Sequence, residues 1–383
     1  MDFNYDLPQT NIAKHPPARR EDARLLHVSR EGPLADLGIT DLPSLLPAGS
    51  GLWVNETKVL HARLIAVKPT GGALELLLLE PRDCPVEQGL VAGSPVVWNA
   101  MVGGAKKWKT GALLVPDSGV GLAVERDGEA LRFSWEGTED FGTVLDRLGR
   151  IPLPPYMRRE AESADADRYQ TIFARLPGSV AAPTAGLHLT PALMQGLADG
   201  GVQCDKVTLH VGVGTFKPLT GAPQGHRMHG ERCIVPLSAV ARLAEGREVT
   251  AVGTTTLRTL ESLYWIACRW RTTGVGPEEP LKQWVHSEVE DPFKSMEEAM
   301  GWLAQSRKGD ESISFVTHLM IVPGYRVRSA ERLLTNFHMP NSTLLCIVEA
   351  MMGEDWRQAY RHAVDSGYRF LSYGDACLLE RRN

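Results

Sequence analysis

The chain has 383 residues, of which 43% are hydrophobic and 23% are charged, and its formal net charge is −5. This composition excludes a disordered or fibrous protein and argues against indiscriminate nucleic-acid binding, and no segment approaches the roughly 18 consecutive apolar residues of a membrane-spanning helix. The N-terminus, MDFNYDLPQT, has acidic residues where a signal peptide has bases and then an apolar run, so we expect a cytoplasmic protein.

The region from about residue 60 to residue 145 contains short apolar runs separated by turn signals. VVWNAMV and VGLAVE are typical of the runs, and Asp127-Gly128 is typical of the turns. Strands of this length joined by such turns predict a small antiparallel β-barrel or sandwich. Three prolines in RIPLPPYMRR, residues 150–159, exclude regular structure there and mark a crossing to another domain.

Beyond the proline-rich segment, predicted helices and strands alternate, which is typical of an α/β domain. We therefore expect residues 1–60 and 150–383 to form one large domain of mixed α/β class. The small antiparallel β-barrel domain, at residues 61–149, would be inserted into it.

The segment VTLHVGVGTFKP, residues 207–218, joins a predicted strand to a glycine-containing turn. Gly212 and Gly214 have the G-x-G spacing of a dinucleotide-binding fingerprint. Lys217 stands where that fingerprint has its third glycine, and Pro218 would break the helix that should follow. The two glycines therefore either let a backbone approach a ligand or another strand, or form only a tight turn.

The segment EVTAVGTTTLRTLESLYWIA predicts a strand that ends at Val252 and a helix that follows it. Thr254 or Thr255 is placed to cap this helix, and Arg258 lies one turn further on. The free N–H groups at the start of a helix can hold an anion, so a carboxylate or a phosphate could bind there. A plain helix cap with a surface arginine would explain the same residues.

The segment LLTNFHMPNSTLLCIVEAMMG, residues 333–353, predicts a loop held against an apolar helix. Pro340 and Ser342 are typical of the start of that helix, which would stop at the last glycine. Asn336 and His338 in the loop can form hydrogen bonds, and a histidine suits proton transfer near neutral pH. A single loop histidine is also common as a purely structural residue.

Two further segments combine small residues with a titratable side chain. VAAPTAGLHLT, residues 180–190, contains His188 and is too interrupted for a helix or strand of ordinary length. YRFLSYGDACLL, residues 368–379, predicts a strand, a turn at residues 372–375 and a second strand. Asp375 would be either a hairpin-turn residue or an acid exposed at a cleft.

Taken in chain order, these segments resemble the S-adenosylmethionine:tRNA ribosyltransferase-isomerase family of queuosine biosynthesis. The resemblance spans about residue 7 to residue 379. The matching segments are LPQTNIAKHPPARREDARLL, VNETKVLHARL, RIPLPPYMRR, YQTIFARLPGSVAAPTAGLHLT, VTLHVGVGTFKPL, HRMHGE, AVGTTTLRTLES, IVPGYRVRSAERLLTNFHMPNSTLL and YRFLSYGDACLL.

The resemblance implies a β-barrel inserted in a larger α/β domain, and S-adenosyl-L-methionine (AdoMet) as a co-substrate that donates its ribosyl group. The implied acceptor is the aminomethyl group of 7-aminomethyl-7-deazaguanine at the wobble position of a tRNA anticodon loop. The products would be epoxyqueuosine in tRNA, adenine and methionine. No metal is required, and the six cysteines are scattered without zinc-binding spacing. We expect a monomer that does not bind a membrane.

The implied reaction needs a base that removes a proton beside the sulfonium, a general acid for the loss of adenine, and a neutral acceptor amine. The resemblance makes His188, His210 and His338 candidates for proton transfer, and Asp375 could orient one of them. Each histidine could instead only hold its loop in place.

The same resemblance implies the candidates for ligand binding. Small residues would admit the ligand close to the backbone at Thr184, Gly186, Gly212 and Gly214. The methionine carboxylate would bind at Thr254, Thr255 and Arg258, with Asn336 as a possible partner. Tyr373 could face the sulfonium, because cations favour π faces. The candidates for tRNA contact are Lys106, Lys107, Lys109, Arg158 and Arg159, although such basic runs are usually only solvated charge.

One segment, residues 268–315, is longer here than is usual in the family. It contains three tryptophans, Trp270, Trp284 and Trp302. It also predicts a helix that begins near Ser295, with Glu298 at the reciprocal position of a capping box. The insertion could add an acceptor-binding surface, a subunit contact or a packed flap.

Two alternatives to a tRNA-modifying transferase stay open from the sequence. One is a paralogous enzyme that uses the same AdoMet chemistry on a small-molecule acceptor, which the insertion and the acidic net charge favour. The other is a non-catalytic tRNA-binding protein, which the histidine and glycine loops disfavour. Glu56 and Glu331 stand where the family usually has Asp, and they keep the charge.

Overall fold

The computed structural model describes residues 3–108, 111–116, 121–212, 214, 219 and 221–382. Contacts within the chain define two compact units. The large unit comprises Met1–Glu56, Thr171–Phe173 and Pro183–Asn383, and the small unit comprises Thr57–Gln170 and Ala174–Ala182. The domain limits inferred from the sequence, residues 1–60 and 150–383 for the large domain and 61–149 for the barrel domain, remain a prediction. Among the described residues, no helix combines the length and the apolar character needed to cross a membrane.

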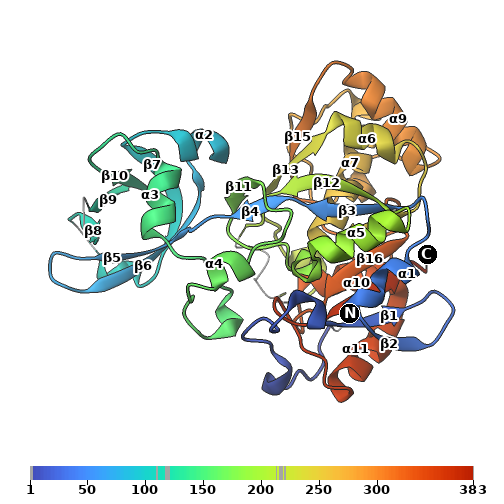
Figure 1. The fold of residues 1–383 in the computed structure, drawn as a ribbon. Coiled ribbons are helices and arrows are strands. Elements are labelled where there is room, and N and C mark those ends of the chain that lie inside the picture. Colours follow the sequence, from blue (N-terminus) through green and yellow to red (C-terminus); the bar gives the residue numbers. More distant parts are fainter. Residues whose placement is uncertain are drawn as a thin grey trace. The chain divides into compact units, whose positions relative to one another are not determined.

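The large unit is built on a nine-stranded sheet with the strand order β15-β13-β12-β3-β14-β16-β17-β1-β2 (Figure 1). Its strands are β1 (Arg24–Val28), β2 (Leu34–Gly38), β3 (Gly51–Asn55), β12 (Gln203–Leu209), β13 (Glu231–Pro236), β14 (Val249–Val252), β15 (Ser312–Thr317), β16 (Arg332–Asn336) and β17 (Ala376–Glu380). Every residue of β3 and β14 is buried, as expected for parallel strands covered on both faces.

The large unit also contains eight α-helices among the described residues. They are α1 (Leu42–Leu45), α5 (Pro191–Asp199), α6 (Leu237–Leu243), α7 (Thr254–Thr273), α8 (Val285–Glu288), α9 (Met296–Ser306), α10 (Thr343–Met352) and α11 (Trp356–Asp365). Of these, α5, α6, α7 and α10 contact strands of this sheet. Leu52 and Val54 of β3 share one face of the sheet because side chains alternate along a strand. Leu193 and Leu197 of α5 belong to the same hydrophobic cluster, so α5 closes the core over that face.

The helix α10 begins and ends close to where the sequence predicts. The hydroxyl of Ser342 accepts a hydrogen bond from the N–H of Leu345 at 3.4 Å, and Gly353 is the residue that ends the helix. These are local interactions between residues three positions apart, so a sequence pattern can reveal them.

The start of α7 differs from the prediction. Gly253, with φ of 89°, is the N-terminal cap, and no side chain caps the helix, so the expectation that Thr254 or Thr255 does so is wrong. A positive φ lets glycine turn the chain directly from β14 into the helix. The threonines then already lie in the first turn, where the Thr256 hydroxyl donates to the carbonyl oxygen of Val252 at 2.7 Å.

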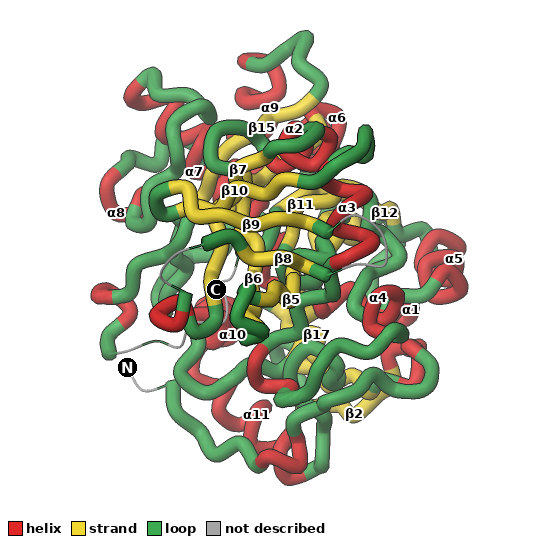
Figure 2. The backbone as a smooth tube through the Cα atoms, turned by 90° about the vertical axis from the view of Figure 1, so that its left-hand side faces the viewer, coloured by secondary structure: helices red, strands yellow, loops and turns green. Residues whose placement is uncertain are grey.

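The small unit contains a closed antiparallel barrel with the strand order β10-β7-β6-β5-β8-β9 (Figure 2). Its strands are β5 (Arg63–Val67), β6 (Ala73–Pro81), β7 (Val96–Val102), β8 (Leu113–Val115), β9 (Leu122–Asp127) and β10 (Ala130–Ser134). Trp98 and Phe133 pack against Phe141, with ring centroids 5.3 and 5.4 Å away. The predicted fold class, mixed α/β with a small antiparallel β-barrel, is confirmed.

Shorter elements complete the small unit. They are β4 (Thr57–Val59), α2 (Val86–Val91), α3 (Phe141–Leu148), α4 (Asp165–Arg168) and β11 (Leu176–Ser179), and β11 pairs in parallel with β4. The proline-rich segment contains only an isolated bridge between Arg150 and Arg63 and the 3₁₀ turn Pro155–Met157, as its prolines indicate.

Residues 268–315, the segment predicted to be longer than usual, belong to the large unit. Ser295 caps α9 by accepting from the N–H of Glu298 at 3.3 Å, as predicted. The Glu298 carboxylate accepts from the N–H of Lys294 at 2.9 Å, one residue earlier than a reciprocal capping box requires. α9 packs on α6 and α7, and Trp302 meets Trp270 edge to face with centroids 5.5 Å apart.

Candidate active site

The candidate residues of the large unit gather at one edge of its sheet. β12, β3, β14 and β16 are parallel neighbours, so their carboxyl ends lie at the same edge, and the antiparallel β17 begins there, with Ala376 opposite Asn336. Asn55, His210, Gly253 and Asp375 all lie at or directly beside these strand ends. Figure 1 shows the strands themselves. This is the edge at which open α/β sheets bind ligands.

The segment predicted to be irregular forms a 3₁₀ turn, Thr184–His188, which contacts the end of β16. The Thr184 hydroxyl donates to Oδ1 of Asn336 at 2.7 Å. Nδ2 of Asn336 lies 3.2 Å from Nε2 of His188 and 3.4 Å from the carbonyl oxygen of Asp375. The Asn336 side chain thus joins Thr184, His188 and Asp375, which lie in two other segments singled out from the sequence.

Small side chains are required where this turn meets its neighbours. A Cβ atom on Gly186 would lie 3.1 Å from Cγ2 of Thr171, which is tighter than ordinary contact. Thr171–Phe173 belongs to the large unit. Gly186 therefore leaves little room for a side chain beside Thr171, and its contact with a ligand stays a prediction.

His188 is an uncharged imidazole at neutral pH. Its side chain is almost completely buried, and burial lowers the pKa of His188 to about 4, with Arg20 and Arg369 lowering it in the same direction. Both cations come from segments that enter the same sheet edge, since Arg20 precedes β1 and Arg369 precedes β17. The Arg20 guanidinium also donates to the carbonyl oxygen of Leu187 at 2.9 Å.

The carboxylate of Asp375 holds two chain segments together. It accepts hydrogen bonds from the backbone N–H of Arg24 at 3.0 Å and of Arg369 at 2.8 Å. Burial raises the pKa of Asp375, although these amides oppose the effect. Among the described residues this carboxylate bonds to no histidine, and Asp375 meets the His188 cluster through its backbone carbonyl.

The turn before β17 is not a hairpin. β17 pairs with β1 and β16, whereas residues 368–371 form only an isolated bridge between Phe370 and Ile12. The hairpin alternative for Asp375 is therefore wrong. Tyr373 is buried within this turn.

His338 lies in a separate part of the same edge. Its Nε2 is 3.0 Å from the hydroxyl of Thr335, and its backbone N–H donates to the Tyr360 hydroxyl at 3.2 Å. The Tyr5 hydroxyl donates to the carbonyl oxygen of His338. Burial lowers the pKa of His338 to about 3, so this imidazole is also uncharged at neutral pH.

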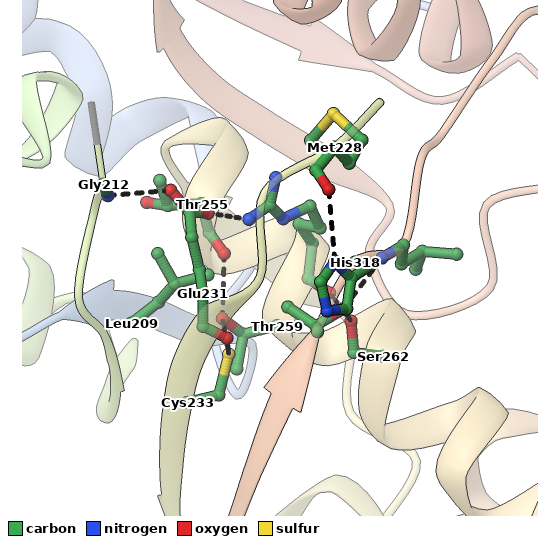
Figure 3. Close-up of polar contacts among 12 residues, drawn as sticks. Leu209, Gly212, Met228, Glu231, Cys233, Thr255, Thr259, Ser262 and His318 are labelled. Carbon is green, nitrogen blue, oxygen red and sulfur yellow. Dashed lines mark hydrogen bonds and ion pairs between the residues drawn. The ribbon is translucent and has the colours of Figure 1, made fainter. Parts of the chain in front are cut away.

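Arg258 is paired with a carboxylate that the sequence did not single out. Arg258 and Glu231 form a buried ion pair, and the N–H of Gly212 donates to Oε1 of Glu231 at 3.0 Å (Figure 3). Burial lowers the pKa of Arg258 to about 10. Glu231 ends the HRMHGE segment, which is the sequence signal that could have identified it.

A second unexpected residue, Asn55, fixes the chain before His210. Its amide donates to the carbonyl oxygen of Leu209 at 2.9 Å and accepts from the N–H of Leu209 at 3.1 Å. The same Nδ2 lies 3.5 Å from the hydroxyl of Thr255. Asn55 thereby connects the ends of β3 and β12 with the start of α7, beside the buried residues Thr254 and His210.

Gly214 is also a close-packing position. A Cβ atom on Gly214 would lie 2.6 Å from Cδ2 of His229, a distance that no relaxed structure accommodates. Gly214 thus packs tightly against the segment that leads to Glu231, whereas a Cβ atom on Gly212 would lie 3.9 Å from Oε1 of Glu231, an ordinary contact distance. Most of residues 213–220 lie outside the described residues.

The basic residues predicted to contact tRNA belong to the small unit. Arg159 forms a two-point ion pair with Asp165, at 2.6 and 2.7 Å, so its charge is already balanced. Arg158 and Lys106 are exposed. Lys109 and the side chain of Lys107 lie outside the described residues. No cluster of three or more potential metal ligands is present among the described residues.

Comparisons with known proteins identify relatives of the chain. A family described as "Queuosine biosynthesis protein" matches residues 1–379. A protein of Azoarcus sp. (strain BH72), named S-adenosylmethionine:tRNA ribosyltransferase-isomerase, is 42% identical over 390 residues, which cover 100% of this chain and 98% of that protein. A protein of the same name from Thermus thermophilus is 40% identical over 396 residues, with 98% of each chain covered.

A solved structure is also similar. The crystal structure of an S-adenosylmethionine tRNA ribosyltransferase from Thermotoga maritima aligns with 98% of this chain and 99% of its own, at 27% identity and a TM-score of 0.47. On the family match over nearly its whole length, and on its full-length relatives, the chain belongs to the queuosine biosynthesis protein family.

Proposed function

We propose that the protein is an AdoMet-dependent tRNA ribosyltransferase-isomerase. It would transfer and isomerise the ribosyl moiety of AdoMet onto 7-aminomethyl-7-deazaguanine at the wobble position of tRNA, releasing adenine and methionine and forming epoxyqueuosine. The observation that carries this proposal is full-length identity of about 40% to proteins of that name, together with the buried His188 cluster at the ligand-binding edge of the sheet.

The sulfonium of bound AdoMet acidifies the neighbouring carbon, and the chain's residues must then manage the proton movements. His188 and His338 both have a lowered pKa and are neutral at pH 7, so neither holds an extra proton for the departing adenine in the free protein. His210 is the third candidate, and Asn55 anchors the residue before it. Asp375 would act as an anchor of the turn at residues 368–375.

The methionine carboxylate would bind at the start of α7, where the backbone N–H groups of Thr254 and Thr255 lie beside Gly253. Arg258 already neutralises Glu231. Arg258 would therefore not offer a free charge to the methionine carboxylate. Its role would be to hold Glu231, which in turn fixes the Gly212 segment. Tyr373 remains the candidate that faces the sulfonium.

Partners and location belong to the same proposal. The enzyme would act as a cytoplasmic monomer without a metal ion and would bind the tRNA anticodon loop. Arg158 and Lys106 are exposed and could contact phosphates, whereas Arg159 is engaged by Asp165. The full-length relatives favour a tRNA acceptor over the small-molecule acceptor that the sequence left open.

The test is chromatographic measurement of adenine release. Purified protein is incubated with AdoMet alone, with unmodified tRNA, and with tRNA that carries 7-aminomethyl-7-deazaguanine. We expect adenine and methionine in equal amounts in the third reaction only. Release that does not depend on tRNA would favour the small-molecule acceptor, and binding of the modified tRNA without any release would refute a catalytic role.

A further inference from the structure

The side-chain amide of Asn336 has a single orientation that satisfies all its neighbours. Its Oδ1 accepts from the Thr184 hydroxyl at 2.7 Å. Its Nδ2 lies 3.4 Å from the carbonyl oxygen of Asp375, which can only accept, and 3.2 Å from Nε2 of His188. The two hydrogens of the amide nitrogen are thus used by one carbonyl oxygen and one imidazole nitrogen.

Turning the amide by 180° would disrupt this arrangement. The oxygen would then face the carbonyl oxygen of Asp375, and two acceptors at 3.4 Å repel each other. The nitrogen would point at Thr184, where only one of its hydrogens finds a partner. Because the orientation of an amide is assigned from its hydrogen-bond network, the backbone carbonyl of Asp375 decides it here.

The orientation of Asn336 determines where His188 carries its proton. A ring nitrogen that receives a hydrogen bond must present a lone pair, so Nε2 is unprotonated and Nδ1 bears the hydrogen. We infer that Asn336 is a positioning residue that holds His188 as the neutral Nδ1–H tautomer, so that the ring donates a hydrogen bond to the substrate and does not act as the base. This inference rests on the proposed function for the substrate that it serves.

The charges around His188 support the same state. Burial lowers the pKa of His188 to about 4, and the positive charges of Arg20 and Arg369 also disfavour an imidazolium ion. The nearest acid of the cluster, Asp375, directs its carboxylate to the backbone N–H groups of Arg24 and Arg369. Among the described residues, Asn336 is the one hydrogen-bond partner of the His188 ring.

The chemical consequence is a division of roles. With Nε2 engaged by an amide and Nδ1 protonated, neither nitrogen of His188 has a lone pair available to remove a proton. Its remaining N–H suits an acceptor atom of the nucleoside, such as a ribose oxygen or a ring nitrogen of adenine. Proton removal beside the sulfonium then falls to another group.

The test reads the tautomer directly by NMR spectroscopy. Long-range ¹H–¹⁵N correlation spectra of the full chain, labelled at its 11 histidines, distinguish the Nδ1–H from the Nε2–H form. The His188 signal is the one missing from a His188→Gln spectrum. We expect the Nδ1–H pattern, unchanged from pH 8 down to about pH 5. An Nε2–H pattern, or protonation with a midpoint near pH 6.5, would overturn the inference.

Two variants add a second readout. Asn336→Asp offers a carboxylate that can only accept, so the His188 proton should move to Nε2 and its pKa should rise by roughly one to three units. Thr184→Val removes the hydroxyl on the other side of the amide and should leave the Nδ1–H pattern intact, because the Asp375 carbonyl still orients Asn336. A switched tautomer in Thr184→Val would contradict this account.

The wild-type spectrum tests the inference even if Asn336→Asp proves too unstable to study. Adenine release is scored separately from the tautomer. A protein with the Nδ1–H form that releases no adenine with the modified tRNA would refute the proposed function alone. An active protein with the Nε2–H form would refute the inference alone.

Discussion

At the scale of single residues, the ion pair between Arg258 and Glu231 shows how burial changes the use of a charge. Both side chains are at most 9% exposed. Taking two charges out of water costs several kcal/mol, which their attraction and the Gly212 N–H must offset. Loss of either partner leaves the other charge buried without its counter-ion, whereas loss of both does not.

We therefore predict strong coupling between these two positions. Arg258→Ala and Glu231→Ala should each lower the free energy of unfolding by about 3 to 5 kcal/mol, and the double variant by clearly less than the sum. Urea unfolding of the four proteins measures this cycle. The exposed pair Arg19–Asp22 is the control, for which solvent screening should leave the two losses close to additive. Additive losses at Arg258 and Glu231 would contradict the buried pair.

The buried histidines predict a pH dependence of stability. The pKa of His188 is lowered to about 4 and that of His338 to about 3 in the folded protein. In the unfolded chain each of these histidines binds a proton as the pH falls through about 6.5, whereas in the folded protein each stays neutral there. Stability from these two groups is complete above that pH and is lost as the pH falls. Between pH 7.5 and pH 5 the loss should be about 2 kcal/mol for each histidine.

Urea unfolding at several pH values between 8 and 5 checks this expectation. The window lies above the range in which most carboxylates titrate, so the histidines dominate the slope. His188→Gln and His338→Gln should each flatten the curve, and the slope that remains should come from the other histidine and from His286, whose pKa burial also lowers. A wild-type stability that does not change over this window would show that the two imidazoles are not buried in the folded protein.

At the scale of elements, the start of α7 depends on one glycine. Gly253 has φ of 89° and ψ of 149°, a region that other residues adopt only with strain. Gly253→Ala should cost about 1 to 3 kcal/mol in urea unfolding and should reduce adenine release, because Thr254 and Thr255 would move with the helix start. Gly274, at the other end of α7, also has a positive φ, and a Cβ atom added there would meet nothing within 4 Å. Gly274→Ala is therefore the matched control variant.

This second variant separates backbone strain from the function of the helix start. Gly274→Ala should cost about 1 kcal/mol and leave adenine release unchanged, since it alters only the C-terminal cap. Equal loss of activity in the two variants would argue that α7 affects the reaction through global stability. That outcome would remove the reason for placing the methionine carboxylate at its N-terminal end.

The elements themselves were largely predictable, and their connections were not. Short apolar runs separated by turn signals indicate the barrel strands, and Ser342 and Ser295 cap their helices through neighbours three residues away. By contrast, the Asp375 carboxylate accepts from the N–H of Arg24, 351 positions away in the sequence. Such a contact follows from the strand order β17-β1, which no local pattern encodes.

The candidate site shows the same limit. The histidines and the glycine loops were identifiable from their segments, but Glu231 as the partner of Arg258 and Asn55 as the anchor of Leu209 were not. Both depend on which strands lie side by side. The helix cap expected at Thr254 or Thr255 failed for a local reason, because a glycine with positive φ ended the strand first.

At the scale of the whole molecule, each compact unit has a core of its own. Phe133 packs in the barrel against Phe141, and Leu334 belongs to the hydrophobic cluster of the large sheet. The chain passes from one unit to the other at residues 56–57, 170–171, 173–174 and 182–183. The 3₁₀ turn Thr184–His188 lies directly after the last of these four positions.

Separate cores predict separate loss of protection when one of them is damaged. Phe133→Ala deletes a fully buried ring and should destabilise the barrel by about 3 to 5 kcal/mol. Hydrogen–deuterium exchange followed by mass spectrometry should then show faster exchange in β5 to β10, with β3, β14 and β16 unchanged. Leu334→Ala is the matched opposite, and it should accelerate exchange in the large sheet and spare the barrel. If either variant accelerated exchange equally in both units, the two would form one cooperative structure, and a weakened barrel would expose the His188 cluster as readily as a weakened sheet.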